Sequence, residues 1–121
     1  MASVDDQLPT VEGTSWPIVL FVELIGARAK EWSRALEEAN IIVLSEGSIL
    51  RAAFVVTNER PSAVLLPATL PVERTQVVRD AARDVGAEIL TLRPTQTPAE
   101  VKGMVEDAIA AVRKRRGAPP R

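Results

Sequence analysis

The stretch SAVLLPATLP, Ser62 to Pro71, decides how the rest of the chain is interpreted. Its apolar part, Ala63 to Leu66, is uninterrupted, which is typical of a strand covered on both faces in a parallel sheet. In an open α/β protein, ligands and nucleophiles lie in the loop that follows such a strand. Here the residue that ends the strand is Pro67, whose side chain is neither acidic nor nucleophilic. The sequence therefore predicts a fold that commonly has a ligand-binding or catalytic site after this strand. The residue at that position, Pro67, has no side chain that could act there.

The segments on either side alternate between strand-like and helix-like patterns. Continuous apolar runs predict strands, and apolar residues at helical spacing predict helices. The order βαβαβαβα, with right-handed crossovers, predicts a four-stranded parallel sheet in the order 2-1-3-4 between helices on both faces. The predicted strands are Pro17–Leu24, Ile41–Ser45, Ser62–Leu66 and Ala87–Leu92, and the predicted helices start near Ile25, Ser48, Val72 and Pro98.

The second predicted helix, Ser48 to about Asn58, is ambiguous because AFVVT within it favours a strand. We prefer a helix, since parallel strands need a crossover connection. This segment has almost no polar face, and a sheet buries only one side of a helix. Either its outer side is an interface, for a protein partner or a homodimer, or the segment is not a regular helix. The candidate interface residues are Ile49, Phe54, Val55 and Val56, with the neighbouring edge strand Ile41 to Ser45.

Composition excludes several classes of function. The 121 residues include no Cys and no His, which rules out thiol catalysis, cysteine or histidine metal sites and histidine-based triads. The net charge of −1 argues against a nucleic-acid partner, and no apolar run is long enough for a membrane span. We expect a cytoplasmic protein with a flexible lead at residues 1–15, one domain at 16–116 and a flexible tail at 117–121. The basic run Arg113 to Arg116 is interpreted as a solvated helix end.

Two segments resemble response-regulator receiver domains. IIVLSEGSILRAAFVVTNERPSAVLLPATLP is similar to their second strand, second helix and third strand, where a run such as PDLVLLD precedes a loop with Pro. VRDAARDVGAEILTLRPTQTPAEVKGMVEDAIAAVRKR is similar to their closing helix, turn, strand and capped final helix. The resemblance covers Pro17 to about Arg116. It implies a flavodoxin-like, receiver-like three-layer sandwich that lacks one αβ unit of the family.

The family's phosphorylation site is degenerate in this sequence. By the resemblance, the acidic pair that holds Mg²⁺ corresponds to Glu23 and Leu24, the phosphoacceptor Asp to Pro67, and the Lys to Arg93. One carboxylate beside Leu and Pro is a poor magnesium site, and proline cannot be phosphorylated. We therefore expect a pseudo-receiver without cofactor, metal or catalysis, which binds proteins independently of phosphorylation in bacterial signalling.

An alternative function uses the same edge of the sheet. Glu23 and Arg93 end two different strands and could meet there as an ion pair, or as a small-ligand or enzymatic site. Gly26 follows the first strand but lacks the residues of a phosphate-binding loop, so we interpret it as a tight turn. Trp32 falls on the apolar stripe of its helix and is expected in the core, whereas Trp16 fits either the core or an interface.

Overall fold

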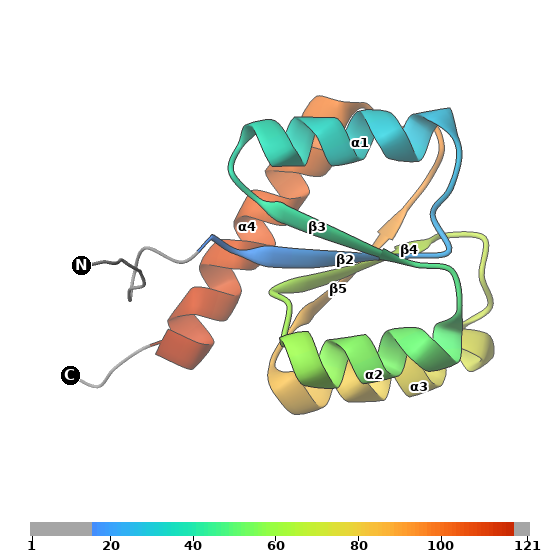
Figure 1. Cartoon of the computed structure of the whole chain (residues 1–121), viewed down its shortest axis with the longest axis vertical. Helices are drawn as coiled ribbons and strands as arrows, with labels where there is room; N and C mark the ends of the chain where they lie inside the picture. Colours follow the sequence, from blue (N-terminus) through green and yellow to red (C-terminus); the bar gives the residue numbers. More distant parts are fainter. Residues whose placement is uncertain (1–15, 118–121) are drawn as a thin grey trace, which may run out of the picture.

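The computed structural model describes residues 16–117 (Figure 1). The predicted flexible lead, and all but the first residue of the predicted tail, lie outside the described residues. Strands and helices alternate along the chain, as the sequence predicts. The elements are β2 (Ile18–Val22), α1 (Ala27–Glu38), β3 (Ile42–Glu46), α2 (Ile49–Glu59), β4 (Ala63–Pro67), α3 (Val72–Val85), β5 (Glu88–Leu92) and α4 (Pro98–Gly117).

The four strands form one parallel sheet in the order β3-β2-β4-β5. This confirms the predicted order 2-1-3-4 and the flavodoxin-like α/β fold. Leu20 is paired with Leu44 on one side and with Val64 on the other, so β2, the first of the described strands, lies inside the sheet. From β2 the chain adds β3 on one side of the sheet, and it then returns to add β4 and β5 on the other side. The carboxyl ends of β2 and β4 are therefore the switch point of this parallel sheet.

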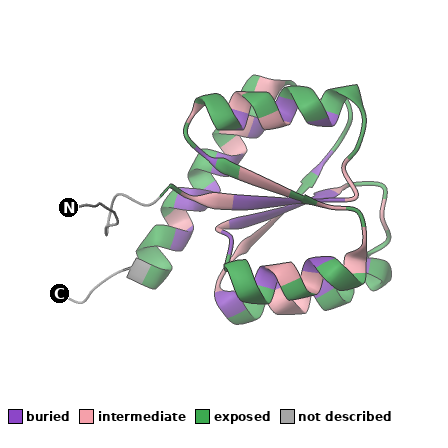
Figure 2. Cartoon of the chain, viewed as in Figure 1, coloured by how far each residue is buried: buried purple, intermediate pink, exposed green. Residues whose placement is uncertain are grey.

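Two hydrophobic cores fill the space between the sheet and its helical layers (Figures 1 and 2). The α1 and α4 layer covers one face and packs against Phe21 and Leu65, while the α2 and α3 layer covers the other and packs against Leu20 and Leu66. Successive side chains of a strand point to opposite faces, so the central strands β2 and β4 must be apolar at nearly every position. That requirement explains the uninterrupted runs in the sequence.

The helix ends follow the predicted signals. Asn40 and Gly86 both adopt the left-handed conformation, with φ of 64° and 75°. Thr97 and Glu100 form a reciprocal capping box: Glu100 accepts from the Thr97 amide at 2.8 Å, and Thr97 accepts from the Glu100 amide at 3.1 Å. The ambiguous segment is the regular helix α2, capped by the Ser48 side chain. The strand preference of AFVVT is overridden because β3 and β4 are parallel and need a crossover between them.

The end of α4 differs from the expected solvated tail. Arg116 donates hydrogen bonds to three backbone carbonyls, those of Val85 at 3.0 Å, Arg60 at 3.1 Å and Pro61 at 2.8 Å. Arg115 donates to the Gly86 carbonyl and forms an ion pair of 2.7 Å with Glu88. The interpretation of these two arginines as free in solvent is therefore wrong. The reason is the length of α4, which carries them back to the amino edge of the sheet, where α2 and α3 end.

Candidate functional site

Three of the four residues that the receiver resemblance assigns to a degenerate phosphorylation site lie together at the carboxyl edge of the sheet. Glu23, Leu24 and Pro67 share a pocket of about 170 Å³ with Trp32 and Thr69. This volume is below the roughly 300 Å³ at which small-molecule sites usually begin. The pocket lies at the switch point, as the fold predicts, but apolar side chains and prolines form much of its wall.

The fourth residue, Arg93, does not join the other three. Glu23 pairs instead with Arg74, whose Nη2 lies 3.3 Å from Glu23 Oε2, so the predicted Glu23–Arg93 pair is wrong. Arg93 follows β5, which is separated from β2 by β4, and two strand spacings amount to about 9.6 Å. Arg74 lies in the first turn of α3, directly after β4, the neighbour of β2. The order of the strands therefore places Arg74 closer to Glu23 than Arg93.

The backbone at Glu23 is strained. Its φ of 54° lies in the left-handed region, which costs a residue other than glycine roughly 1–2 kcal/mol. The Glu23 amide nevertheless donates to the Glu46 carbonyl at 2.9 Å, which continues the pairing of β2 with β3 beyond the strand. The chain bends sharply here so that α1 can begin at Ala27. The predicted tight turn at Gly26 belongs to the same bend, with φ of 96°.

Gln96 organises the loop after β5, a role that the sequence did not indicate. Its Oε1 accepts from the Arg93 amide at 2.7 Å, and its carbonyl accepts from Trp32 Nε1 at 2.9 Å. The predicted core position of Trp32 is confirmed, with 3% of its surface exposed. A polar residue in a loop carries no periodic signal, and its partner on α1 is distant in the sequence. Only the packing of α1 beside this loop could reveal the contact.

The chemistry available at this edge is limited. Within residues 16–117 no group of three or more acidic side chains lies close enough together to hold a metal ion. Mg²⁺ prefers a near-octahedral shell of oxygen ligands, and Glu23 already accepts a hydrogen bond from Arg74. The alternative ligand-binding or enzymatic site requires Glu23 and Arg93 to lie together. Arg93 instead lines a separate depression with Glu100 and Met104.

The candidate interface on α2 is different from the predicted one. Phe54 is 72% exposed, as expected for a contact residue, and Leu50, one turn before it, is 71% exposed. Val56 is fully buried against the sheet, so its assignment to the interface is wrong. Ile49 and Val55 are half-buried and pack against the same core. An all-apolar helix gives no contrast from which its buried side can be predicted, and Leu50 was missed for that reason.

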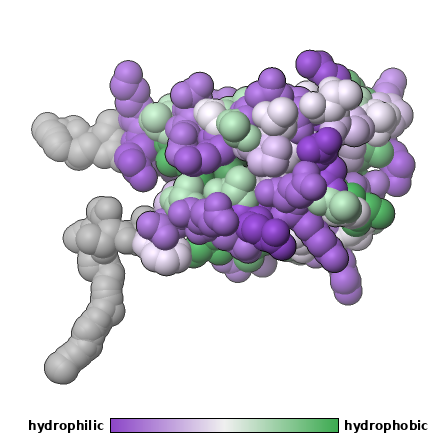
Figure 3. Space-filling model, turned by 90° about the horizontal axis from the view of Figure 1, so that it is seen from above, coloured by the Kyte–Doolittle hydropathy of each residue, from purple (hydrophilic) through white to green (hydrophobic). Residues whose placement is uncertain are grey.

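Further exposed apolar residues lie on the neighbouring helix. Val72 and Val77 of α3 are 56% and 42% exposed. The helices α2 and α3 pack side by side and begin at the same edge of the sheet (Figure 1). We call Leu50, Phe54, Val72 and Val77 the α2–α3 surface. On the opposite layer, the face seen in Figure 3 is mostly hydrophilic, with smaller hydrophobic areas between its polar side chains. Ile25, which precedes α1, is exposed.

Trp16 lies at the amino edge of the sheet. Its indole is 56% exposed and lines a pocket of about 270 Å³ together with Arg60 and Arg113. The sequence left open whether Trp16 belongs to the core or to an interface, and the structure places it at the surface rather than in the core. No helix among residues 16–117 combines the length and the apolar character that a membrane span requires.

Comparisons with known proteins give no family for this chain. No protein-family model matches it, and no curated protein matches it. Among solved structures, a de novo designed Rossmann fold protein matches with a TM-score of 0.46 and 18% identity, over 77% of this chain and 97% of that one.

Proposed function

We propose that this domain is a cytoplasmic pseudo-receiver of bacterial two-component signalling, which acts as a non-catalytic protein-binding module independent of phosphorylation. The proposal depends mainly on the α2–α3 surface. Phe54 and Leu50 are exposed on the same side of a helix whose other side is already filled by the core. Large exposed apolar side chains are a common mark of a partner site, and aromatic anchors often dominate binding energy.

The carboxyl edge supports the same proposal. A receiver needs a metal-binding carboxylate pair and an aspartate acceptor, and the corresponding positions hold Glu23, Leu24 and Pro67. Glu23 is engaged by Arg74, which supplies the positive charge that a metal would otherwise bring. A binding function through α2 and α3 requires none of these groups.

A pull-down comparing matched variants tests the binding surface. Phe54→Lys replaces the anchor, and Asn58→Lys introduces the same charge at an exposed position of the same helix. We expect a bacterial protein that is retained by the wild type and by Asn58→Lys but lost with Phe54→Lys. With that protein purified, calorimetry should show about tenfold or greater weakening by Phe54→Lys. Equal affinity for the two variants would overturn the assignment of this surface.

Incubation with acetyl phosphate and Mg²⁺ tests the loss of the switch. Intact-mass measurement should show no acid-stable or acid-labile phosphate adduct, because the acceptor position is Pro67. Pro67→Asp alone should also remain unmodified, because Leu24 still withholds the second carboxylate from the metal. An adduct on Glu23 or on a neighbouring acidic residue would contradict the proposal.

A further inference from the structure

A second surface, distinct from the α2–α3 surface, lies along the edge strand β3. Within residues 16–117 this strand ends the sheet, and β2 is the one described strand that pairs with it. The Ile42 amide donates to the Pro17 carbonyl, and the Glu46 carbonyl accepts from the Glu23 amide, so these residues direct their backbone groups towards β2. Backbone direction alternates along a strand. The amides and carbonyls of Val43 and Ser45 therefore point away from the sheet.

The available length of this edge is sharply limited. The Ile41 amide donates to the Leu36 carbonyl, and the Gly47 amide donates to Glu46 Oε2. The amides on either side of β3 are thus already hydrogen-bonded within the chain. Among the described residues of this edge, Val43 and Ser45 are the ones whose backbone groups can pair with a further strand. The strand sequence IVLSE also lacks the Lys and Pro with which exposed edges are commonly protected.

We propose that β3 pairs antiparallel with β3 of a second copy of this chain, which joins the two four-stranded sheets. The free positions set the register: Val43 of one copy faces Ser45 of the other, and the twofold axis passes beside Leu44. Each Val43–Ser45 pair exchanges its two amide–carbonyl hydrogen bonds. Leu44 of the two copies then lie opposite one another, and the exposed Ile42 is partly covered.

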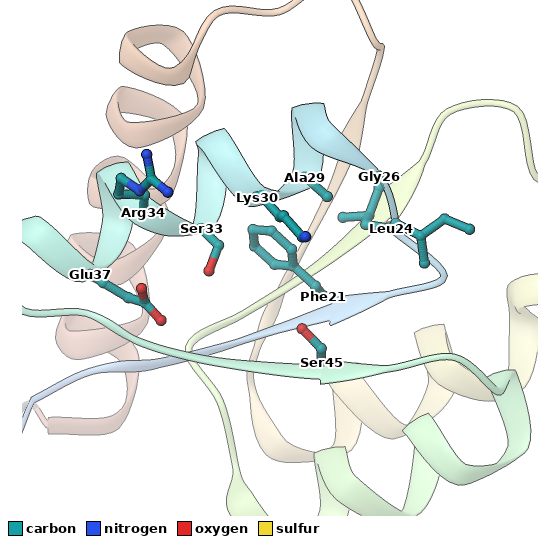
Figure 4. Close-up of a pocket in the computed structure, with 10 residues that line it drawn as sticks. Phe21, Leu24, Gly26, Ala29, Lys30, Ser33, Arg34, Glu37 and Ser45 are labelled. Carbon is teal, nitrogen blue, oxygen red and sulfur yellow. The ribbon is translucent and has the colours of Figure 1, made fainter.

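The flank of α1 above β3 supplies complementary charges. Lys30, Ser33, Arg34 and Glu37 line a groove of about 500 Å³ that also includes Phe21 and Ser45 (Figure 4). The groove runs along α1, between this helix and the edge strand β3. Its basic residues come first along the helix, and its acidic residue comes last. A row with opposite charges at its two ends is complementary to itself when a twofold axis reverses it.

The second copy brings the two α1 helices to packing distance. Helix α1 lies over β2 and β3, so it is about one strand spacing from the proposed axis, and the two helices are separated by about 10 Å. Helices pack at about 8–10 Å. Running antiparallel, Lys30 of each copy meets Glu37 of the other, and the short Ser33 lies near the axis. This charge pairing favours a second copy over an unrelated strand as the occupant of the edge.

Charge reversal tests the contact between the helices. Light scattering and sedimentation should show twice the mass of one chain for the wild type at high concentration. Glu37→Lys and Lys30→Glu should each weaken dimerisation about tenfold or more by placing like charges together. An equimolar mixture of the two single variants should dimerise again, because in the mixed dimer both contacts between positions 30 and 37 join opposite charges. Glu106→Lys on α4 makes the same charge change elsewhere and should leave the dimer unaffected.

Amide exchange and a proline variant test the strand pairing. The Val43 and Ser45 amides should be protected from hydrogen exchange at high concentration and exchange faster on dilution. Ser45→Pro removes a donor that has no partner within the described chain, so it should abolish the dimer while circular dichroism reports a folded protein. A monomer at millimolar concentration, or a dimer unaffected by both charge reversal and Ser45→Pro, would overturn the proposal. Neither result bears on partner binding at the α2–α3 surface.

Discussion

Replacing Arg116 by alanine should destabilise this domain, although the residue lies at the end of the last described helix. Its guanidinium joins three elements, because it donates to the carbonyls of Val85 at the end of α3, Arg60 after α2, and Pro61 before β4. Burial lowers the pKa of Arg116 from its ordinary value, and the nearby charges of Arg60 and Arg115 lower it further. The group nevertheless stays protonated, because the guanidinium of arginine is not deprotonated in proteins.

The expected cost follows from these contacts. A hydrogen bond with a charged partner contributes about 1.5–3 kcal/mol when its loss leaves a buried group unpaired. Arg116 borders an open pocket, so water can reach part of the vacated space and reduce the loss. We expect Arg116→Ala to lower the free energy of unfolding by about 2 kcal/mol, and the melting temperature by roughly 8 °C. Arg116→Lys should recover less than half, because an ammonium lacks the planar fork that reaches three carbonyls.

Urea and thermal unfolding followed by circular dichroism measure both quantities. Lys114→Ala is the matched control, since it removes a charge from an exposed position two residues earlier on α4. It should change the unfolding free energy by less than about 0.5 kcal/mol. A loss of 1 kcal/mol should lower the melting temperature by roughly 4 °C. If the melting temperature of Arg116→Ala lies within about 2 °C of that of the control, the three hydrogen bonds do not stabilise the fold.

Other substitutions probe the core and the backbone, and unfolding measurements check each of them. Val56→Lys should prevent folding or lower the free energy of unfolding by more than about 3 kcal/mol, because it buries a charge. Phe54→Lys should stay within about 0.5 kcal/mol of the wild type. Similar losses for both variants would show that α2 is buried on both sides. Trp32→Phe should cost about 1–2 kcal/mol, since the Gln96 carbonyl loses its donor, and an unchanged stability would exclude that contact. Gly86→Ala should cost about 1 kcal/mol through its left-handed backbone alone, because the added Cβ would meet only Arg116 Nε at an ordinary 3.8 Å; a much larger loss would indicate a steric clash.

The carboxyl edge shows which parts of the site could be predicted. Pro67 was assigned correctly to the end of β4, and Leu24 to the same edge of the sheet, because strands in a doubly wound fold end at one edge. The predicted first strand was too long, since β2 ends at Val22, two residues before Leu24. That the side chains of Pro67 and Leu24 can neither accept a phosphoryl group nor bind a metal follows from residue identity alone. The partner of Glu23 did not, since the choice between Arg74 and Arg93 depends on which strand is the neighbour of β2. An ion pair depends on distances of a few ångströms, which the order of residues does not contain.

By itself, the sequence determined the elements and the order of the sheet. Continuous apolar runs, capping residues and the need for right-handed crossovers are local or topological constraints, and each can be identified without coordinates. Only the tertiary structure decided that Val56 is buried while Phe54 faces solvent, and that Arg116 joins the ends of α2 and α3. It also decided that the backbone groups of Val43 and Ser45 point away from β2, at the edge of the described sheet. These outcomes depend on how helices are rotated against the sheet and on where a long helix ends. Both are set by packing between residues far apart in the chain, for which a single sequence carries no periodic signal.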